Sequence, residues 1–266
     1  MTDINDSCLD LYYRKKENQL FKHTEYENGV FMAESSLVIH RALDAGYQPL
    51  SFLIVENEYS NYQDVFDRCD SDITIYKVSE EIFQQLKGFI LLKGILGCFL
   101  RNQKENLSQL LNQSKRIVVL ENLQNPTNVG AIFRNAAALF CDAVLLTDDC
   151  ADPLYKRSIR VSMGNVFNIP WTYVNKKEYI QLLKENGYKI VSFALRDDSV
   201  DIEDEALNQE EKLAIIMGSE GYGLEKETID QSDYVVKIAM NPEVDSLNVA
   251  SASGIALWQL CKKNRK

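Results

Sequence analysis

The chain has 266 residues, of which 45% are hydrophobic and 26% are charged, a composition typical of a soluble globular protein with one large or two modest domains. Its formal net charge of −10, from 29 basic and 39 acidic residues, argues against a protein that grips nucleic acid over its whole surface, although it allows a local basic face. No apolar run approaches the ~18–20 residues of a membrane span and the N-terminus has no signal-peptide pattern, so we expect a cytoplasmic protein without a membrane partner.

Residues that often carry metal or nucleophile chemistry are sparse. The two histidines, His23 and His40, both lie in the N-terminal third, so we expect neither a histidine-based triad nor a metal site in the C-terminal part. His40 falls within an amphipathic helix pattern, which favours a structural role. The six cysteines are scattered without a CxxC pair, as is typical of reduced thiols in a cytosolic protein.

The first hundred residues alternate between strand and helix patterns, which predicts a small α/β sandwich. Ser79 is placed to cap a helix, because its hydroxyl can accept a hydrogen bond from an unpaired backbone N–H of the first turn. The expected strands are 29–32, 50–55, 73–78 and 94–100, and the expected helices are 10–22, 34–45, 62–68 and 79–86.

The second half begins after a polar stretch, 102–115, where we place a domain boundary. From residue 116 apolar strands alternate with helices, which predicts a mostly parallel sheet with both faces covered. An acidic segment, 197–211, reads as an exposed excursion without chemistry of its own. The expected strands are 117–120, 143–146, 171–174, 189–193, 213–217 and 234–238, and the helices are 127–140, 153–163, 176–186, 225–231 and a terminal one.

Three unusual loops follow strands of this sheet, and in parallel sheets ligands bind beyond the carboxyl ends of strands. The first loop, 121–140, is rich in asparagine. Arg134 follows Asn128 by six residues, so both could face one cleft, and an arginine fork suits a phosphate or a ribose edge. The alternative is an ordinary asparagine cap with a surface arginine.

The second loop, 215–227, has three glycines within six residues around Glu220, which lets the backbone approach a ligand closely. Its spacing, GxxGxG, differs from the GxGxxG of dinucleotide-binding folds. A glycine-rich turn by itself is a weak signal.

The third loop leads from a strand into the terminal helix. We expect Ser246 to cap this helix, and Ala250, Gly254, Leu257 and Cys261 recur at helical spacing as its buried stripe. Five small residues, 250–254, indicate that something approaches this backbone closely; tight helix–sheet packing is the other reading.

Together the loops offer asparagines, an arginine, one carboxylate and exposed backbone, without a nucleophile or a metal cluster. Such a site fits group transfer between two bound substrates, where positioning supplies most of the acceleration.

The three loops, in this order, resemble the SpoU (TrmH) family of RNA ribose 2′-O-methyltransferases within the SPOUT class. The matching stretches are NPTNVGAIFR at 125–134, IMGSEGYGL at 216–224 and SLNVASA at 246–252, and YKRSIRVSMGNVFNIP at 155–170 is similar to the family's second helix. The stretch FMAESSLVIHRALDAG at 31–46 resembles the start of the ribosomal-protein-like domain that many members carry.

The resemblance implies a domain plan and a cofactor. We expect an α/β ribosomal-protein-like substrate-binding domain at 1–105, a linker at 106–115, and at 116–266 an α/β SPOUT-type domain with a parallel sheet and a deep trefoil knot, a rare exception to unknotted topology. S-adenosylmethionine is expected in the knot, and a homodimer through the knotted domain. The implied cofactor-binding residues are Met217, Gly218, Ser219, Gly221, Ile238, Met240, Leu247, Asn248 and Ala252.

The resemblance also implies the catalytic residues Arg134, Asn128, Glu220, Ser246 and Asn248. Arginine stays charged, so it is implausible as a free base. We therefore expect Arg134 to orient the ribose or its phosphate and to stabilise developing alkoxide charge, while a phosphate of the nucleic acid or a water accepts the proton.

Three alternatives stay open. The acidic charge supports an RNA-binding or ribosome-assembly protein that keeps the knot but does not catalyse, and other SPOUT lineages methylate bases instead of riboses. Within the ribose methyltransferases, the N-terminal domain favours rRNA over tRNA as substrate by fold-level association alone, and an antibiotic-resistance methylase has the same architecture.

Overall fold

The structure is a computed structural model of the chain. It describes residues 6–21, 26–87, 94–102, 105–194, 196, 199–219, 221, 223–241, 243–244 and 246–264. The chain forms two compact units, one of residues 1–103 with 154–168 and one of residues 104–153 with 169–266. None of the helices in the described ranges has the length and apolar character that crossing a bilayer requires.

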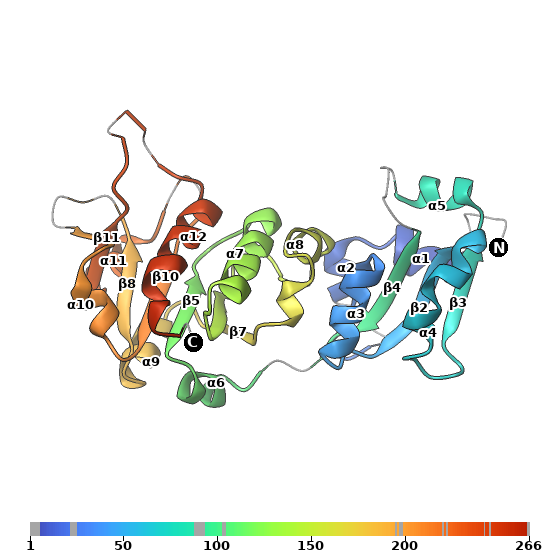
Figure 1. Cartoon of the computed structure of the whole chain (residues 1–266), viewed down its shortest axis with the longest axis horizontal. Coiled ribbons are helices and arrows are strands. Elements are labelled where there is room, and N and C mark those ends of the chain that lie inside the picture. The colour runs from blue at the N-terminus through green and yellow to red at the C-terminus, as the bar shows by residue number, and fades with distance from the viewer. Residues whose placement is uncertain are drawn as a thin grey trace. The chain divides into compact units, whose positions relative to one another are not determined.

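The first unit is built on a four-stranded sheet in the order β1-β4-β2-β3 (Figure 1). Strand β4 pairs antiparallel with β1 and β2, while β2 pairs parallel with β3. The alternation predicted from the sequence is therefore confirmed. The elements are η1 (Ser7–Leu9), α1 (Asp10–Tyr13), α2 (Glu17–Phe21), β1 (Val30–Glu34), α3 (Ser36–Asp44), β2 (Pro49–Val55), η2 (Glu56–Tyr62), α4 (Gln63–Phe66), β3 (Thr74–Val78), α5 (Glu80–Lys87), β4 (Ile95–Leu100), α8 (Lys156–Val161) and η3 (Asn165–Phe167).

Both faces of this sheet are covered. Alternate strand residues such as Met32 and Leu53 pack with side chains of α1, α2 and α5. On the opposite face the Phe31 ring stacks on Phe99 with 5.5 Å between centroids. His40 bonds Asp64 through Nε2 at 2.7 Å and Arg68 through Nδ1 at 3.0 Å, which confirms its structural role; His23 lies outside the described residues.

Residues 154–168, which we expected within the C-terminal domain, pack with the first unit instead. The Phe167 ring lies 5.4 Å from that of Phe31, and Arg41 donates a hydrogen bond to the Met163 carbonyl at 2.5 Å. These contacts join segments more than 100 residues apart, so local sequence patterns could not reveal them.

The second unit contains a seven-stranded sheet in the order β7-β6-β5-β10-β8-β11-β9, and every pair in it is parallel. The predicted parallel sheet is confirmed. The elements are α6 (Leu107–Gln113), β5 (Arg116–Leu120), α7 (Pro126–Ala138), β6 (Ala143–Thr147), β7 (Trp171–Val174), α9 (Tyr179–Glu185), β8 (Lys189–Phe193), β9 (Val200–Asp201), α10 (Glu205–Gln209), β10 (Leu213–Met217), α11 (Lys226–Asp230), β11 (Tyr234–Lys237), α12 (Val249–Leu260) and η4 (Lys262–Asn264).

Helices cover both faces of this sheet because its strands are apolar on both sides. Residues Ile117 and Ile216 form one core with side chains of α6 and α9, joined by Ile229 of α11. On the other face α7 and α12 lie side by side (Figure 1). Asn135 of α7 donates to the Ala250 carbonyl at 2.8 Å and to Ser253 Oγ at 3.0 Å, so a polar tie joins the two helices.

Two segments differ from the prediction. The expected linker 106–115 contains α6, whose Leu110 and Leu111 are buried. Because most of the surrounding residues are polar, the two leucines do not produce a recognisable amphipathic pattern. The acidic excursion contains β9 and α10 and is anchored by the buried Arg116. Arg116 donates to the carbonyl oxygens of Glu210 and Glu211 at 2.7 and 2.8 Å, so this segment carries a structural role.

Candidate active site

A pocket of about 330 Å³ lies in the second unit, at the carboxyl ends of β8, β10 and β11. This is the edge at which parallel α/β sheets bind ligands, and the volume is in the range of small-molecule sites. The residues that line it are mostly apolar: Phe193, Ala194, Gly223, Leu224, Ile229, Val236, Lys237, Ile238, Met240, Ser246, Leu247 and Ala252.

Four of the predicted cofactor residues line this pocket: Ile238, Met240, Leu247 and Ala252. The predicted catalytic residue Ser246 lines it too. The predicted residues Met217, Gly218, Ser219, Gly221 and Asn248 are not among its lining residues. Sequence reasoning missed the contribution of β8, where Phe193 and Ala194 end an apolar strand like those before the other loops.

The glycine loop, residues 218–224, forms one wall through its last two residues. Ser219 and Gly223 exchange backbone hydrogen bonds of 3.0 and 3.2 Å, which close the loop into a tight turn. A Cβ atom on Gly218 would lie 2.5 Å from the Gly223 carbonyl carbon and 2.6 Å from the Leu224 nitrogen. Glycine at 218 is therefore required by close backbone packing.

The asparagines of the first loop have separate tasks. Asn125 caps α7, because its side chain accepts from the Thr127 N–H at 2.9 Å. Asn122 has φ +52°, a left-handed conformation that asparagine tolerates, and its N–H donates to Thr147 Oγ1 at 3.0 Å. Asn122 and Asn125 therefore have structural roles, as in an ordinary asparagine cap. Asn128 is the remaining asparagine of the loop that could contact a ligand.

Asn128 meets Asn248 where α7 and α12 begin. Asn248 Nδ2 donates to Asn128 Oδ1 at 3.4 Å. Asn128 is 4% exposed, and its own Nδ2 is buried without a hydrogen-bond partner among the residues that the structure describes. Because an unsatisfied buried donor costs about 1–3 kcal/mol, this amide is a candidate for binding an oxygen that the chain itself does not supply.

The cap of α12 is Asn248 and not Ser246. Helix α12 begins at Val249, and Asn248 Oδ1 accepts from the Ala250 N–H at 2.9 Å. Ser246, two residues before the cap, is left to line the pocket. The expected buried stripe is right at Leu257 and Cys261 but not at Gly254, which is half-buried beside Asn135.

Arg134 does not share a cleft with Asn128 in one chain. Six residues turn a helix by about 600°, so the two side chains leave α7 about 120° apart. Asn128 is buried, whereas Arg134 is exposed and has no hydrogen bond or ion pair with the described part of the chain. Glu220 lies outside the described residues. Within the described ranges, no group of three His, Cys, Asp or Glu side chains could hold a metal ion.

The chain is thus an α/β protein with an apolar pocket at the carboxyl ends of parallel strands. Residues 115–258 match the SpoU rRNA Methylase family. A Mycobacterium bovis protein named as an uncharacterized tRNA/rRNA methyltransferase is 32% identical over 263 residues, which are 97% of this chain and 89% of that protein. The chain therefore belongs to the SpoU rRNA methylase family, a family of RNA methyltransferases.

A second relative and two solved structures extend this comparison. The 23S rRNA (guanosine(2553)-2′-O)-methyltransferase RlmP of Bacillus subtilis is 28% identical over 192 residues, 72% of this chain and 74% of RlmP. The crystal structure of AdoMet-bound rRNA methyltransferase from Sinorhizobium meliloti superposes with a TM-score of 0.82 at 23% identity and covers 99% of this chain and 97% of that one. The SpoU methyltransferase AviRb from Streptomyces viridochromogenes, in complex with AdoMet, has a TM-score of 0.80 at 17% identity, covering 97% and 98%. At these identities the structures establish the fold.

Proposed function

We propose that this protein transfers a methyl group from S-adenosylmethionine to a ribose 2′-hydroxyl of RNA, with rRNA as the substrate. The observation that carries the proposal is the apolar pocket at the ends of β8, β10 and β11, bounded by the second and third family motifs. Support comes from the similar fold of AdoMet-bound structures and from the relative RlmP, whose name states a 2′-O-methyltransferase of 23S rRNA.

The residues around the pocket fit this cofactor. No backbone hydrogen bond joins Ile238 or Met240 to the described part of the chain, so their amide groups are available to pair with the edge of an adenine. Leu247 and Ala252 line the pocket with apolar surface and would hold the apolar part of the cofactor, and Gly223 of the glycine loop would bring backbone close to it. When bound, S-adenosylmethionine supplies a methyl group on a positively charged sulfur.

The chain's own residues would hold the accepting ribose. The unpaired Nδ2 of Asn128 donates to a ribose or phosphate oxygen, and Asn248 orients that amide from the opposite helix. The guanidinium of Arg134 binds the phosphate in a bidentate manner and stabilises charge on the 2′-oxygen. We propose that Ser246 and Glu220 also orient the ribose.

A homodimer would bring these groups together. Arg134 is exposed and outside the pocket of its own chain, so it can serve the pocket of a second copy. Exposed apolar side chains support such a contact: Phe140, two residues after α7, is 49% exposed, and Ile255 and Trp258 on α12 are 40% and 56% exposed. A second copy that covered these side chains would remove apolar surface from water.

The proposal includes the knot and the domain plan. The knot rests on the family resemblance, and the observation that accompanies it is that α12, which follows β11 in the chain, lies beside α7. The first unit, with its four-stranded α/β sheet, would be the ribosomal-protein-like domain that binds RNA, and the second unit, residues 104–153 and 169–266, would be the methyltransferase domain.

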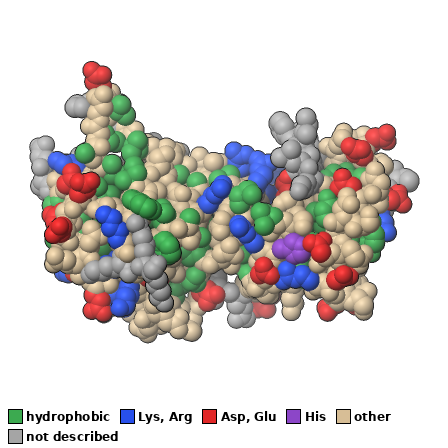
Figure 2. Space-filling model, viewed as in Figure 1, with side chains coloured by type: hydrophobic (Ala, Val, Ile, Leu, Met, Phe, Trp, Pro, Cys, Tyr) green, Lys and Arg blue, Asp and Glu red, His purple; other side chains and the backbone are tan. Residues whose placement is uncertain are grey.

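A basic face on the first unit supports RNA as the partner. Helix α8 carries Lys156, Arg157 and Arg160, of which the arginines are exposed. Glu17 accepts from the Lys156 N–H at 3.1 Å, which brings the basic residues 14–16 near this helix. Figure 2 shows Lys and Arg side chains gathered over α8, although the whole chain is acidic. Phosphate contacts of this kind supply affinity without sequence preference.

Transfer of tritiated methyl groups tests the proposal. The full chain is incubated with labelled S-adenosylmethionine and, separately, with total rRNA and total tRNA from a strain that lacks the gene. We expect label in rRNA. Label in tRNA alone would move the substrate to tRNA, and cofactor binding without label in either RNA would favour the non-catalytic RNA-binding protein, which the net charge of −10 supports.

A further inference from the structure

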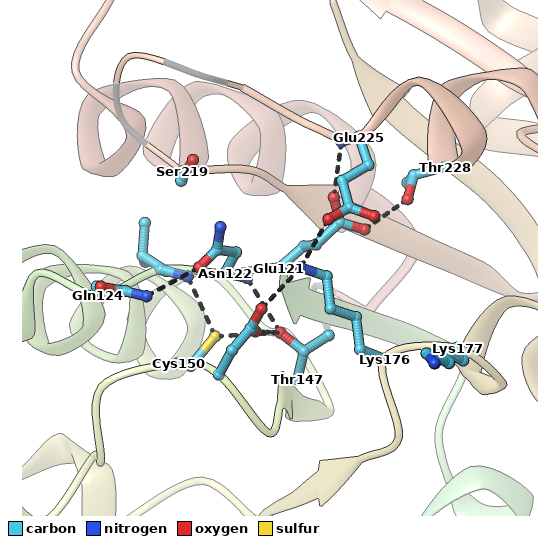
Figure 3. Close-up of polar contacts among 12 residues, drawn as sticks. Glu121, Asn122, Gln124, Thr147, Cys150, Lys176, Lys177, Ser219, Glu225 and Thr228 are labelled. Carbon is cyan, nitrogen blue, oxygen red and sulfur yellow. Dashed lines mark hydrogen bonds and ion pairs between the residues drawn. The ribbon is translucent and has the colours of Figure 1, made fainter.

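Glu121 is a buried carboxylate at the end of β5 that takes no part in the proposed chemistry. It is 1% exposed and accepts three hydrogen bonds: from the Glu225 N–H at 2.9 Å, from Thr228 Oγ1 at 2.6 Å and from Tyr179 Oη at 2.5 Å. Figure 3 shows its carboxylate directed at Glu225 and Thr228. No Lys or Arg among the described residues bonds this carboxylate, so it depends on these three donors.

The bonds of Glu121 hold both ends of the glycine loop. Its backbone N–H donates to the Met217 carbonyl at 2.9 Å, at the point where the loop begins. Its carboxylate accepts from Glu225, where the loop ends and α11 begins. One residue thus fixes the entry and the exit of the loop whose Gly223 and Leu224 line the pocket.

A lysine bound by two carboxylates lies at the same end of the loop. Lys176 Nζ bridges Asp149 and Glu225, at 2.7 Å to each carboxylate (Figure 3). The hydrogen bonds that Lys176 donates to Asp149 and then to Glu225 raise the pKa of Lys176, so it stays charged. Burial, followed by the charge of Glu121, raises the pKa of the Tyr179 hydroxyl, which keeps that hydroxyl protonated as a donor.

We propose that Glu121 is a positioning residue for cofactor binding: through Tyr179, Thr228 and the Glu225 N–H it holds the end of the glycine loop whose Gly223 and Leu224 line the pocket. The inference rests on the proposed function, because the ligand is S-adenosylmethionine. It differs from a general role in stability, since buried hydrogen bonds elsewhere in the same core do not touch the loop.

The core offers a matched pair of tyrosines for the test. Tyr179 and Tyr188 belong to one hydrophobic cluster and are 1% and 2% exposed. The Tyr188 hydroxyl donates to the carbonyl oxygens of Leu111 and Ser114 at 3.0 and 2.7 Å, away from the loop. Tyr179→Phe and Tyr188→Phe therefore each delete one buried hydroxyl, and only the first deletes a donor to Glu121.

The measurement is the dissociation constant of S-adenosylmethionine by isothermal titration calorimetry, with Tm recorded for every variant of the full chain. We expect Tyr179→Phe to raise Kd at least about 3-fold, since one lost hydrogen bond corresponds to roughly 2- to 12-fold and one to a charged group to more. We expect Glu121→Gln, which removes the charge that all three donors share, to raise Kd at least about tenfold. Tyr188→Phe should lower Tm and leave Kd within about twofold.

Each outcome supports or contradicts a separate statement. Wild-type Kd in a folded Tyr179→Phe variant, or an equal rise in Tyr188→Phe, would overturn the positioning role while the proposed function stands. No binding by the wild-type chain would overturn the proposed function and this inference with it. If Glu121→Gln does not fold, the two tyrosine variants still decide the question.

Discussion

Substitution of Gly218 by alanine tests how the glycine loop shapes the pocket. The added Cβ would lie 2.5 Å from the Gly223 carbonyl carbon, about 1 Å closer than ordinary van der Waals contact. The obstructing atoms are backbone, so they cannot rotate away, and the turn must open. Overpacking of this kind costs roughly 1–3 kcal/mol. If binding has to close the turn again, the Kd for S-adenosylmethionine rises about 5- to 150-fold.

A second glycine provides the control for the Gly218→Ala variant. Gly187 has φ +81° and no atom within 4 Å of its added Cβ, so Gly187→Ala strains the backbone in the turn after α9 without filling space near the pocket. Calorimetric titration with S-adenosylmethionine should give a raised Kd for Gly218→Ala and an unchanged Kd for Gly187→Ala, with Tm lowered in both. An unchanged Kd for a folded Gly218→Ala would refute the closed turn as part of the binding site.

Further predictions concern α12, the arginine, the dimer and the first unit. Gly254→Ala should raise Tm by about 1–4 °C, because an added Cβ meets Asn135 Nδ2 at an ordinary 3.5 Å and alanine stabilises a helix interior by roughly 0.5–1 kcal/mol; a lower Tm would reveal tighter packing. Arg134→Lys should lower kcat at least about 100-fold in the methyl-transfer assay although the charge is kept, and wild-type turnover would contradict the bidentate role. If two copies share each site, Arg134→Ala and Gly218→Ala chains refolded together should recover about a quarter of wild-type activity at an S-adenosylmethionine concentration far below the Kd of Gly218→Ala, whereas mixing without refolding should recover none. In the first unit, burial raises the pKa of the Cys98 thiol from 9.0 to about 12. The neutral thiol therefore stabilises the fold fully below pH 9, and this stabilisation is lost as pH rises towards 12, by up to about 1.4 kcal/mol per pH unit. Between pH 9 and 11 the free energy of unfolding in urea should accordingly fall less steeply for Cys98→Ala than for the wild type.

Strands were predictable from the sequence because each is a short apolar run with turn residues at its ends. Six of the predicted strands lie in the seven-stranded parallel sheet, and the seventh, β9, is a two-residue strand in the acidic segment that the sequence did not indicate. The pocket lies at the carboxyl ends where the loops were expected. A helix cap was predictable where only one nearby side chain could cap the helix. Ser79 accepts a hydrogen bond from the Ile82 N–H at 3.3 Å, as expected. Where Ser246 and Asn248 competed, the choice depended on Asn128 of α7, which is 120 positions away.

Long-range pairing accounts for what the sequence did not reveal. Glu121 was visible as a carboxylate directly after a buried strand, but its donors come from α9 and α11. The orientation of Arg134 away from Asn128, in contrast, follows from six residues of helical spacing and was therefore predictable from the sequence. A charged residue at the end of an apolar strand is a usable signal for such positioning groups.

The most direct test of the central claim is the identity of the methylated atom. After transfer from S-adenosylmethionine, rRNA is digested to nucleosides and analysed by mass spectrometry, with fragmentation to separate ribose from base. The account predicts a methyl group that stays with the ribose at the 2′-oxygen and disappears with Arg134→Lys. A methyl group that stays with the base would contradict it.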